Sequence, residues 1–129
     1  MNQMNEVQAF ITSLFHTKFD DLDLHAIEKH IRSVKETTPS VSRSNSGGWQ
    51  SPIFQSYDSP EIERLFEDRI NFNAFGLINY VMKHARSFSK VEYWYNVNTP
   101  NSFNMPHVHP RSILAGVLYV KVPKNSGKT

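Results

Sequence analysis

The stretch SKVEYWYNVN, residues 89–98, decides the expected fold, because its aromatic and β-branched side chains favour an extended strand. Side chains alternate along a strand, so this stretch has two faces: Tyr93, Tyr95 and Val97 form one, and Trp94, Asn96 and Asn98 form the other. Asparagine is depleted in strands. Two asparagines on one face therefore indicate either a solvated outer surface, which is the commoner case, or a polar face that lines a ligand pocket.

Two further stretches have strand character. ILAGVLYVKV, residues 113–122, is almost continuously apolar, which predicts a strand that is buried on both faces or nearly so. FITSLFHTKFDD, residues 10–21, is rich in Phe, Ile and Thr and predicts an early strand. The strands are thus expected mainly within residues 89–122.

The region before these strands, residues 21–88, is expected to be largely helical. DLDLHAIEKHIRSVKE, residues 21–36, repeats apolar residues at helical spacing, and Asp21 or Asp23 can cap its first turn. A loop rich in Ser, Thr, Pro and Gly follows it and ends in a turn at Gly47-Gly48.

Two more helices are expected over residues 59–70 and 72–85. Ser59 can cap the first of them, and Pro60 suits the first helical position. Helical spacing predicts these inward side chains: Ile62, Leu65, Phe66 and Ile70, then Phe75, Ile78, Val81, Met82 and Ala85. Helices followed by clustered strands predict one α+β domain, residues 1–129, in which helices pack against a sheet.

The composition limits the kinds of protein that this chain can be. Its 129 residues include no cysteine, which excludes disulfides, thiolate metal ligands and cysteine nucleophiles. A formal charge of +2 without a basic stripe gives no signal for nucleic-acid binding. No apolar run is long enough to span a membrane, and the N-terminus lacks the features of a signal peptide. We therefore expect a cytoplasmic protein with no membrane partner.

His107 and His109 are the residues for which we expect a chemical role, as metal ligands. On extended backbone, side chains at positions i and i+2 leave on the same side, which is the geometry for two ligands of one metal ion. Pro106 and Pro110 stiffen the backbone on either side of the pair. Neutral imidazole suits iron, zinc, copper and nickel. Two surface histidines in a loop would give the same motif by chance, and the residues alone leave both interpretations open.

Four segments, taken in order, resemble a family of 2-oxoglutarate- and Fe(II)-dependent oxygenases found in bacteria and marine phages. The segments are SNSGGWQS from residue 44, WYNVN from residue 94, NMPHVHPRS from residue 104 and AGVLYVKVPKNSGK from residue 115. The resemblance covers roughly residues 42–129. It implies a double-stranded β-helix, or jelly-roll, with helices packed on one of its sheets.

The resemblance also implies cofactors and site residues. Fe(II) would be bound by a facial triad of two histidines and one carboxylate, with 2-oxoglutarate as co-substrate. His107 matches the first ligand. His109 stands where a carboxylate is usual, so it is either a ligand in an all-nitrogen site or a neighbour of the ligands. Asn96 and Asn98 match positions that face 2-oxoglutarate, and Tyr119 can reach the same pocket, although a core aromatic is its commoner role.

The resemblance further implies that part of the site lies elsewhere. A jelly-roll needs about eight strands, and this chain supplies fewer. In the family, later strands carry a distal histidine and the Arg or Lys that binds the 2-oxoglutarate carboxylate. Among the other histidines, His25 and His30 are expected to be solvated, and neither they nor His16 and His84 suit the third ligand. We therefore expect a chain truncated at its C-terminus, which binds iron weakly and 2-oxoglutarate hardly at all.

Two alternatives remain open. A cupin-like metal-binding protein also uses an H-x-H motif on a β-barrel, but it usually adds a glutamate shortly afterwards, and PRSILAG (110–116) has no carboxylate. A truncated oxygenase could instead serve as a non-enzymatic interaction module, for example a homodimer that covers its exposed sheet edge. The substrate is not indicated, because unrelated substrates share this fold.

Overall fold

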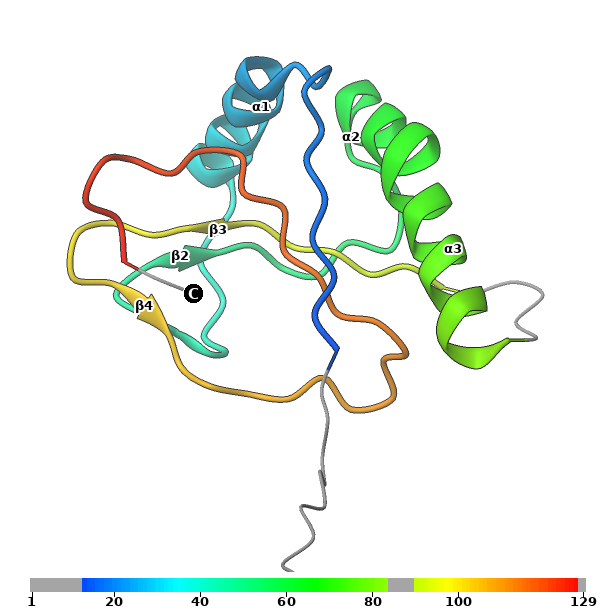
Figure 1. The fold of residues 1–129 in the computed structure, drawn as a ribbon. Helices are drawn as coiled ribbons and strands as arrows, with labels where there is room; N and C mark the ends of the chain where they lie inside the picture. The colour runs from blue at the N-terminus through cyan, green and yellow to red at the C-terminus, as the bar shows by residue number, and fades with distance from the viewer. Residues whose placement is uncertain (1–12, 84–89, 128–129) are drawn as a thin grey trace, which may run out of the picture.

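The structure is a computed structural model and describes residues 13–83 and 90–127. Its helices lie above and beside two short antiparallel ribbons (Figure 1). The elements follow in the order α1 (Leu24–Thr37), β1 (Asn45–Ser46), β2 (Trp49–Gln50), α2 (Pro60–Leu65), η1 (Phe66–Ile70), α3 (Asn71–Met82), β3 (Asn96–Val97) and β4 (Phe103–Asn104). This mixture confirms the α+β class. The described residues form only two-stranded sheets, so they do not show a jelly-roll.

The first expected helix is present as α1. Asp23 begins it, because its Oδ1 accepts a hydrogen bond from the Ala26 backbone N–H at 2.9 Å. Ile27 is buried on the inner face of α1. The other apolar residues at helical spacing, Leu24, Ile31 and Val34, are partly buried against the same core. The prediction of an amphipathic helix here is confirmed.

The two helices expected over residues 59–70 and 72–85 form one continuous helical run from Pro60 to Met82. Its middle turn, Phe66–Ile70, is π-helical, which is a rare arrangement that recurs near functional sites. Lys83 ends the run with a left-handed backbone, φ 59°. The prediction of two separate helices was wrong, because the backbone continues as a helix through the π turn.

The prediction of which side chains face the core is confirmed for the first half of this run, residues 60–70, and is wrong for most of α3. Ile62, Leu65 and Phe66 are buried, and Ile70 packs partly against the core. In α3 only Ile78 is buried, whereas Phe75, Val81 and Met82 are between 41% and 56% exposed. Helical periodicity identified apolar positions, but in the described part of the chain α3 has too few neighbours to cover them. Ala85 lies outside the described residues.

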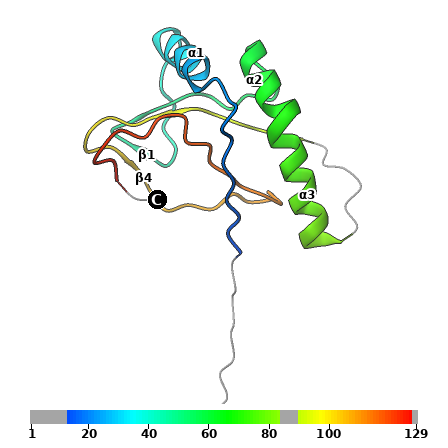
Figure 2. The same cartoon turned by 45° about the horizontal axis from the view of Figure 1, so that its top comes forward.

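The two ribbons bring distant segments together. Strand β2 pairs with β3, where Trp49 lies opposite Val97, and β1 pairs with β4. Figure 2 shows β1 beside β4 from a second direction. The turn between β1 and β2 requires Gly47, whose φ of +76° is unfavourable for other residues. The expected turn at Gly47-Gly48 is confirmed.

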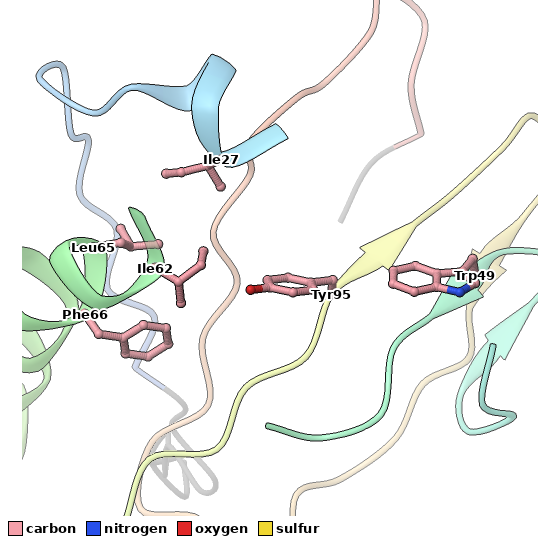
Figure 3. Packing of buried hydrophobic residues seen from close by; sticks show 6 residues of the cluster. All are labelled: Ile27, Trp49, Ile62, Leu65, Phe66 and Tyr95. Carbon is pink, nitrogen blue, oxygen red and sulfur yellow. The ribbon is translucent and has the colours of Figure 1, made fainter. Parts of the chain in front are cut away.

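The core joins the helices to the 89–98 segment. Figure 3 shows Ile27 of α1 and the side chains of the long helix facing Tyr95, with Trp49 on the far side of Tyr95. Trp49 is buried, and its Nε1 donates a hydrogen bond to the Thr38 carbonyl, just after α1, at 2.9 Å. Trp49 therefore fixes α1 against the ribbon.

The strands are shorter than expected. Among residues 90–98 only Asn96–Val97 is a strand, although a bridge between Phe54 and Tyr93 extends the pairing. The strand predicted at 113–122 was wrong, and so was the early strand for residues 13–19. Residues 10–12 lie outside the described part.

The failed strand at 113–122 has a physical reason. A strand forms only when a neighbouring strand pairs with its backbone, and no described segment pairs with these residues. Leu118 and Val120 still pack partly on the core, whereas Val117, Tyr119 and Val122 are more than half exposed. The segment is therefore mostly exposed rather than buried on both faces.

Candidate metal-binding site

The two histidine rings lie next to each other. The ring centroids of His107 and His109 are 4.7 Å apart, and the ring planes meet edge to face at 77°. His107 is exposed and His109 is partly buried. The two imidazoles are therefore close together, as the i, i+2 spacing predicted, and their role as ligands of one metal ion stays a prediction.

A backbone contact orients the ring of His107. Its Nδ1 lies 2.7 Å from the carbonyl oxygen of Met105, so Nδ1 carries the proton and donates. The lone pair is then on Nε2, which points away from that contact. Metal-binding histidines commonly have this second hydrogen bond, because it fixes both the tautomer and the ring orientation. Met105 is itself fixed, since its N–H donates to the Ser44 carbonyl at 2.7 Å.

The ring of Trp94 contacts the ring of His109. Their ring centroids are 5.6 Å apart, with 35° between the planes. Tyr93 and Tyr95 face the core, so Trp94 projects from the opposite face, as the alternation predicted. The histidine pair thus lies on the face of the 89–98 segment that also carries Asn96 and Asn98.

The two asparagines are exposed on that face. Asn98 is held in place, because its Nδ2 donates to Asn104 Oδ1 at 3.2 Å. It also lies so close to Gly48 that a Cβ atom on that glycine would collide with Asn98 Oδ1. Tyr119 is 52% exposed, so it is not a core aromatic. The role of all three towards a co-substrate stays a prediction.

A third ligand does not join the pair within the described residues, where no group of three His, Asp or Glu side chains could hold a metal ion. His16 and His25 are exposed, as expected for His25. The expectation that His30 is solvated was wrong. Its side chain is only 17% exposed and its Nε2 lies 3.0 Å from Asp58 Oδ2. His84 lies outside the described part.

His30 belongs to a polar cluster that the sequence analysis missed. Asp58 Oδ1 accepts hydrogen bonds from the hydroxyls of Tyr95, at 2.7 Å, and Tyr93, at 3.1 Å. Burial, together with the charge and the hydrogen bond of Asp58, raises the pKa of Tyr93 to about 12. Burial and the bond to Asp58 likewise raise the pKa of Tyr95. The sequence could have indicated this position of His30, because His30 follows Ile27 by three residues and so lies beside the inner face of α1.

Comparison with known families gives one match. Residues 92–129 match a family model described as "Putative 2OG-Fe(II) oxygenase", and they cover under a third of the chain. These residues include the histidine pair and both asparagines. No curated protein and no solved structure matches the chain. The match supports the likeness to this family over residues 92–129, whereas the segment SNSGGWQS, the bacterial and phage type and the truncation stay predictions.

None of the helices in the described part of the chain is long and apolar enough to cross a membrane.

Proposed function

We propose that this chain carries part of the iron site of a 2-oxoglutarate-dependent oxygenase, with His107 and His109 as two nitrogen ligands. The observation that carries the proposal is the 4.7 Å separation of the two ring centroids. The match of residues 92–129 to the oxygenase family model supports it independently.

The donors present fit Fe(II) as two ligands of a larger set. Neutral imidazole is a good ligand for non-haem iron. Because Nδ1 of His107 donates to the Met105 carbonyl, Nε2 is the ring nitrogen whose lone pair can bind a metal ion. In this proposal the third ligand, and the cation that pairs with the 2-oxoglutarate carboxylate, lie outside the described residues. Residues 1–129 then form one domain of jelly-roll type, of which the two ribbons are a part.

The polar face beside the pair would bind the co-substrate. Asn96 is exposed and offers amide donors, Asn98 is oriented by Asn104, and Tyr119 offers a phenol. When bound, Fe(II) and 2-oxoglutarate together supply the oxidising chemistry that attacks a C–H bond of the substrate with O₂. This chain's own contribution is to orient the two imidazoles and to present hydrogen-bond donors.

Metal titration tests the proposal on the purified chain. Under anaerobic conditions, Fe(II) or Co(II) is expected to quench the fluorescence of Trp94, because His109 lies against its ring. His107→Ala and His109→Ala should each weaken binding about tenfold or more. His25→Ala, an exposed histidine on α1, is the matched control and should bind as the parent does. Equal binding by all of these variants contradicts the proposal.

The co-substrate separates the oxygenase from a cupin-like protein. If the oxygenase assignment is right, a large excess of 2-oxoglutarate should change the visible spectrum of the Co(II)-loaded chain, but only weakly, because in this proposal the cation that pairs with its carboxylate lies outside the described residues. A cupin-like site would bind the metal without this response. Asn96→Ala should reduce the response while leaving metal affinity unchanged.

A second candidate is a non-enzymatic module that self-associates. The observation that favours it is the exposed apolar surface of residues 103–122, to which these side chains contribute: Phe103, Met105, Val108, Ile113, Val117 and Val122. Burial of such surface in a homodimer would be favourable by about 25 cal/mol per Å². Light scattering during size-exclusion chromatography distinguishes the two: a metal-free dimer favours the module, and a metal-binding monomer favours the oxygenase.

A further inference from the structure

The short ribbon of β1 and β4 comes directly before the histidine pair along the chain. Strand β1 runs beside β4 (Figure 2), and Asn45 lies opposite Asn104 in one of only two residue pairs. The Met105 N–H extends the pairing by one bond, at 2.7 Å, to the Ser44 carbonyl. A two-stranded ribbon this short has little stability of its own. Side-chain contacts across it are therefore expected to decide how firmly β4 is held.

The side chain of Asn104 makes two hydrogen bonds to neighbouring segments. Its Nδ2 donates to Ser44 Oγ at 3.2 Å, which joins β4 to the residue before β1. Its Oδ1 accepts from Asn98 Nδ2 at 3.2 Å, which joins β4 to the residue after β3. Asn104 is partly buried between these partners. An asparagine suits this position, because its amide donates one bond and accepts the other.

The position of the Met105 carbonyl follows from the residues on either side of it. Asn104 precedes it and is held by its side chain. Pro106 follows it, and a proline restricts the preceding residue to extended conformations. With both neighbours constrained, the Met105 carbonyl oxygen lies 2.7 Å from Nδ1 of His107. The orientation of the His107 ring therefore depends on the ribbon that comes before it.

The contact with Met105 matters because His107 is exposed, so packing does little to fix its ring. The Met105 carbonyl accepts from Nδ1 and leaves the lone pair on Nε2. If β4 moved away, the proton could pass to Nε2, and that atom could then no longer bind a metal ion. Loss of a hydrogen bond that orients a metal-binding histidine typically weakens metal binding by about tenfold or more.

We propose that Asn104 is a positioning residue of the metal-binding site: it holds β4 against Ser44, so that the Met105 carbonyl fixes the tautomer and the orientation of His107. This inference rests on the proposed function, in which His107 is an iron ligand. It adds a residue that the sequence analysis did not identify and that acts through Met105. Asn104 also links the two parts of the site. An amide has two N–H groups, so Asn98 can bond to Asn104 and to a co-substrate at once.

The full ¹⁵N-labelled chain without metal tests this role at pH 8, where long-range ¹H–¹⁵N spectra report the tautomer of each imidazole. In the parent, His107 is expected to carry its proton on Nδ1. Asn104→Ala should move a measurable share of the His107 rings to the Nε2–H tautomer, towards the signature of the exposed reference ring of His25. Titration of the same proteins with Co(II) should show binding that is weaker by about threefold to tenfold in Asn104→Ala.

Two further variants separate positioning from a general loss of stability. Asn104→Asp is the conservative variant: its carboxylate can accept from Asn98 Nδ2 and from the Ser44 hydroxyl, so the parental tautomer should return. Asn45→Ala is the matched control. Asn45 lies opposite Asn104 in the same ribbon, but its side chain bonds to backbone groups within residues 43–48. Asn45→Ala should lower the urea midpoint without changing the tautomer or the affinity for Co(II).

Ser44→Ala tests the same link from β1, because it removes the hydroxyl and keeps the carbonyl that binds Met105. It should shift the tautomer in the same direction, and it keeps the test decisive if Asn104→Ala does not fold. The proposal is wrong if Asn104→Ala and Ser44→Ala leave the tautomer unchanged, or if Asn45→Ala changes it as much as they do. A parent that binds no Co(II) contradicts the proposed function instead, and the tautomer comparison still decides the role of Asn104.

Discussion

His30 of α1 and Asp58, which precedes the cap of α2, lie 3.0 Å apart between Nε2 and Oδ2, with side chains 17% and 15% exposed. The distance allows an ion pair, but the two atoms are not aligned as a hydrogen bond. Two tyrosine hydroxyls of the 89–98 segment converge on the other carboxylate oxygen. Asp58 therefore connects the first helix, the start of the second and the ribbon in one cluster.

Removal of the Asp58 carboxylate should destabilise the whole fold. Asp58→Ala leaves the hydroxyls of Tyr93 and Tyr95 without their shared acceptor, which is expected to lower the free energy of unfolding by about 2–3 kcal/mol. Asp58→Asn keeps an acceptor oxygen for the two hydroxyls and loses the charge of the carboxylate, so its cost should be clearly smaller. Urea unfolding measures both. Asp20→Ala, which removes an exposed carboxylate, is the control and should stay within about 0.5 kcal/mol of the parent. Equal losses for the two Asp58 variants would contradict the role assigned to the hydroxyls.

The fold should lose stability at alkaline pH because of the same cluster. The pKa of Tyr93 is raised to about 12 in the folded protein, against about 10 in the unfolded chain. A raised pKa means that the unfolded chain releases its proton first, so the stabilisation is complete below pH 10 and is lost between pH 10 and 12. Tyr95 acts in the same direction.

The measurement is urea unfolding at several pH values, together with ultraviolet titration of the phenols. Tyr93→Phe should be less stable than the parent at pH 8, because it lacks the bonds to Asp58 and Ser56. Its stability should fall less steeply above pH 10. A parallel decline in both proteins would show that Tyr93 does not cause the loss.

The sequence predicted those elements that local physical chemistry determines. Ser59 was identified as a cap and Asp23 was one of two candidates with Asp21, and both Ser59 and Asp23 accept a backbone hydrogen bond. The alternation of residues 89–98 was also correct, because burying Tyr93 and Tyr95 forces the intervening Trp94 to the other face. Local periodicity and cap chemistry need no knowledge of distant residues.

The predictions that were wrong concern features that depend on contacts with residues distant in the sequence. The 113–122 segment has strand propensity, but a strand also needs a pairing partner, which propensity cannot supply. His30 was taken for a solvated residue, because its partner Asp58 is distant along the chain. The position of the histidine pair could be inferred locally, because both rings come from one short segment.

A side chain at Gly48 should destabilise the fold while Asn98 remains. A Cβ on Gly48 would collide with Asn98 Oδ1, so Gly48→Ala should displace that amide from its bond with Asn104. We expect a loss of about 1 kcal/mol in the parent and a much smaller loss in an Asn98→Ala background. Urea unfolding of the four proteins in this cycle gives the coupling energy. Gly116→Ala, at a glycine with open space around it, is the control. A coupling near zero would mean that the two residues do not meet.

The tautomer of His107 should be fixed even without metal. Because Nδ1 lies 2.7 Å from the Met105 carbonyl, the neutral ring should carry its proton on Nδ1 and leave Nε2 unprotonated. Long-range ¹H–¹⁵N spectra of the imidazoles distinguish the two tautomers directly. His25 is exposed and serves as the reference ring on the same chain. A proton found on Nε2 of His107 at pH 8 would remove the donor atom on which the proposed iron site depends, whereas an Nδ1 proton would show that the apo chain already presents that atom to a metal ion.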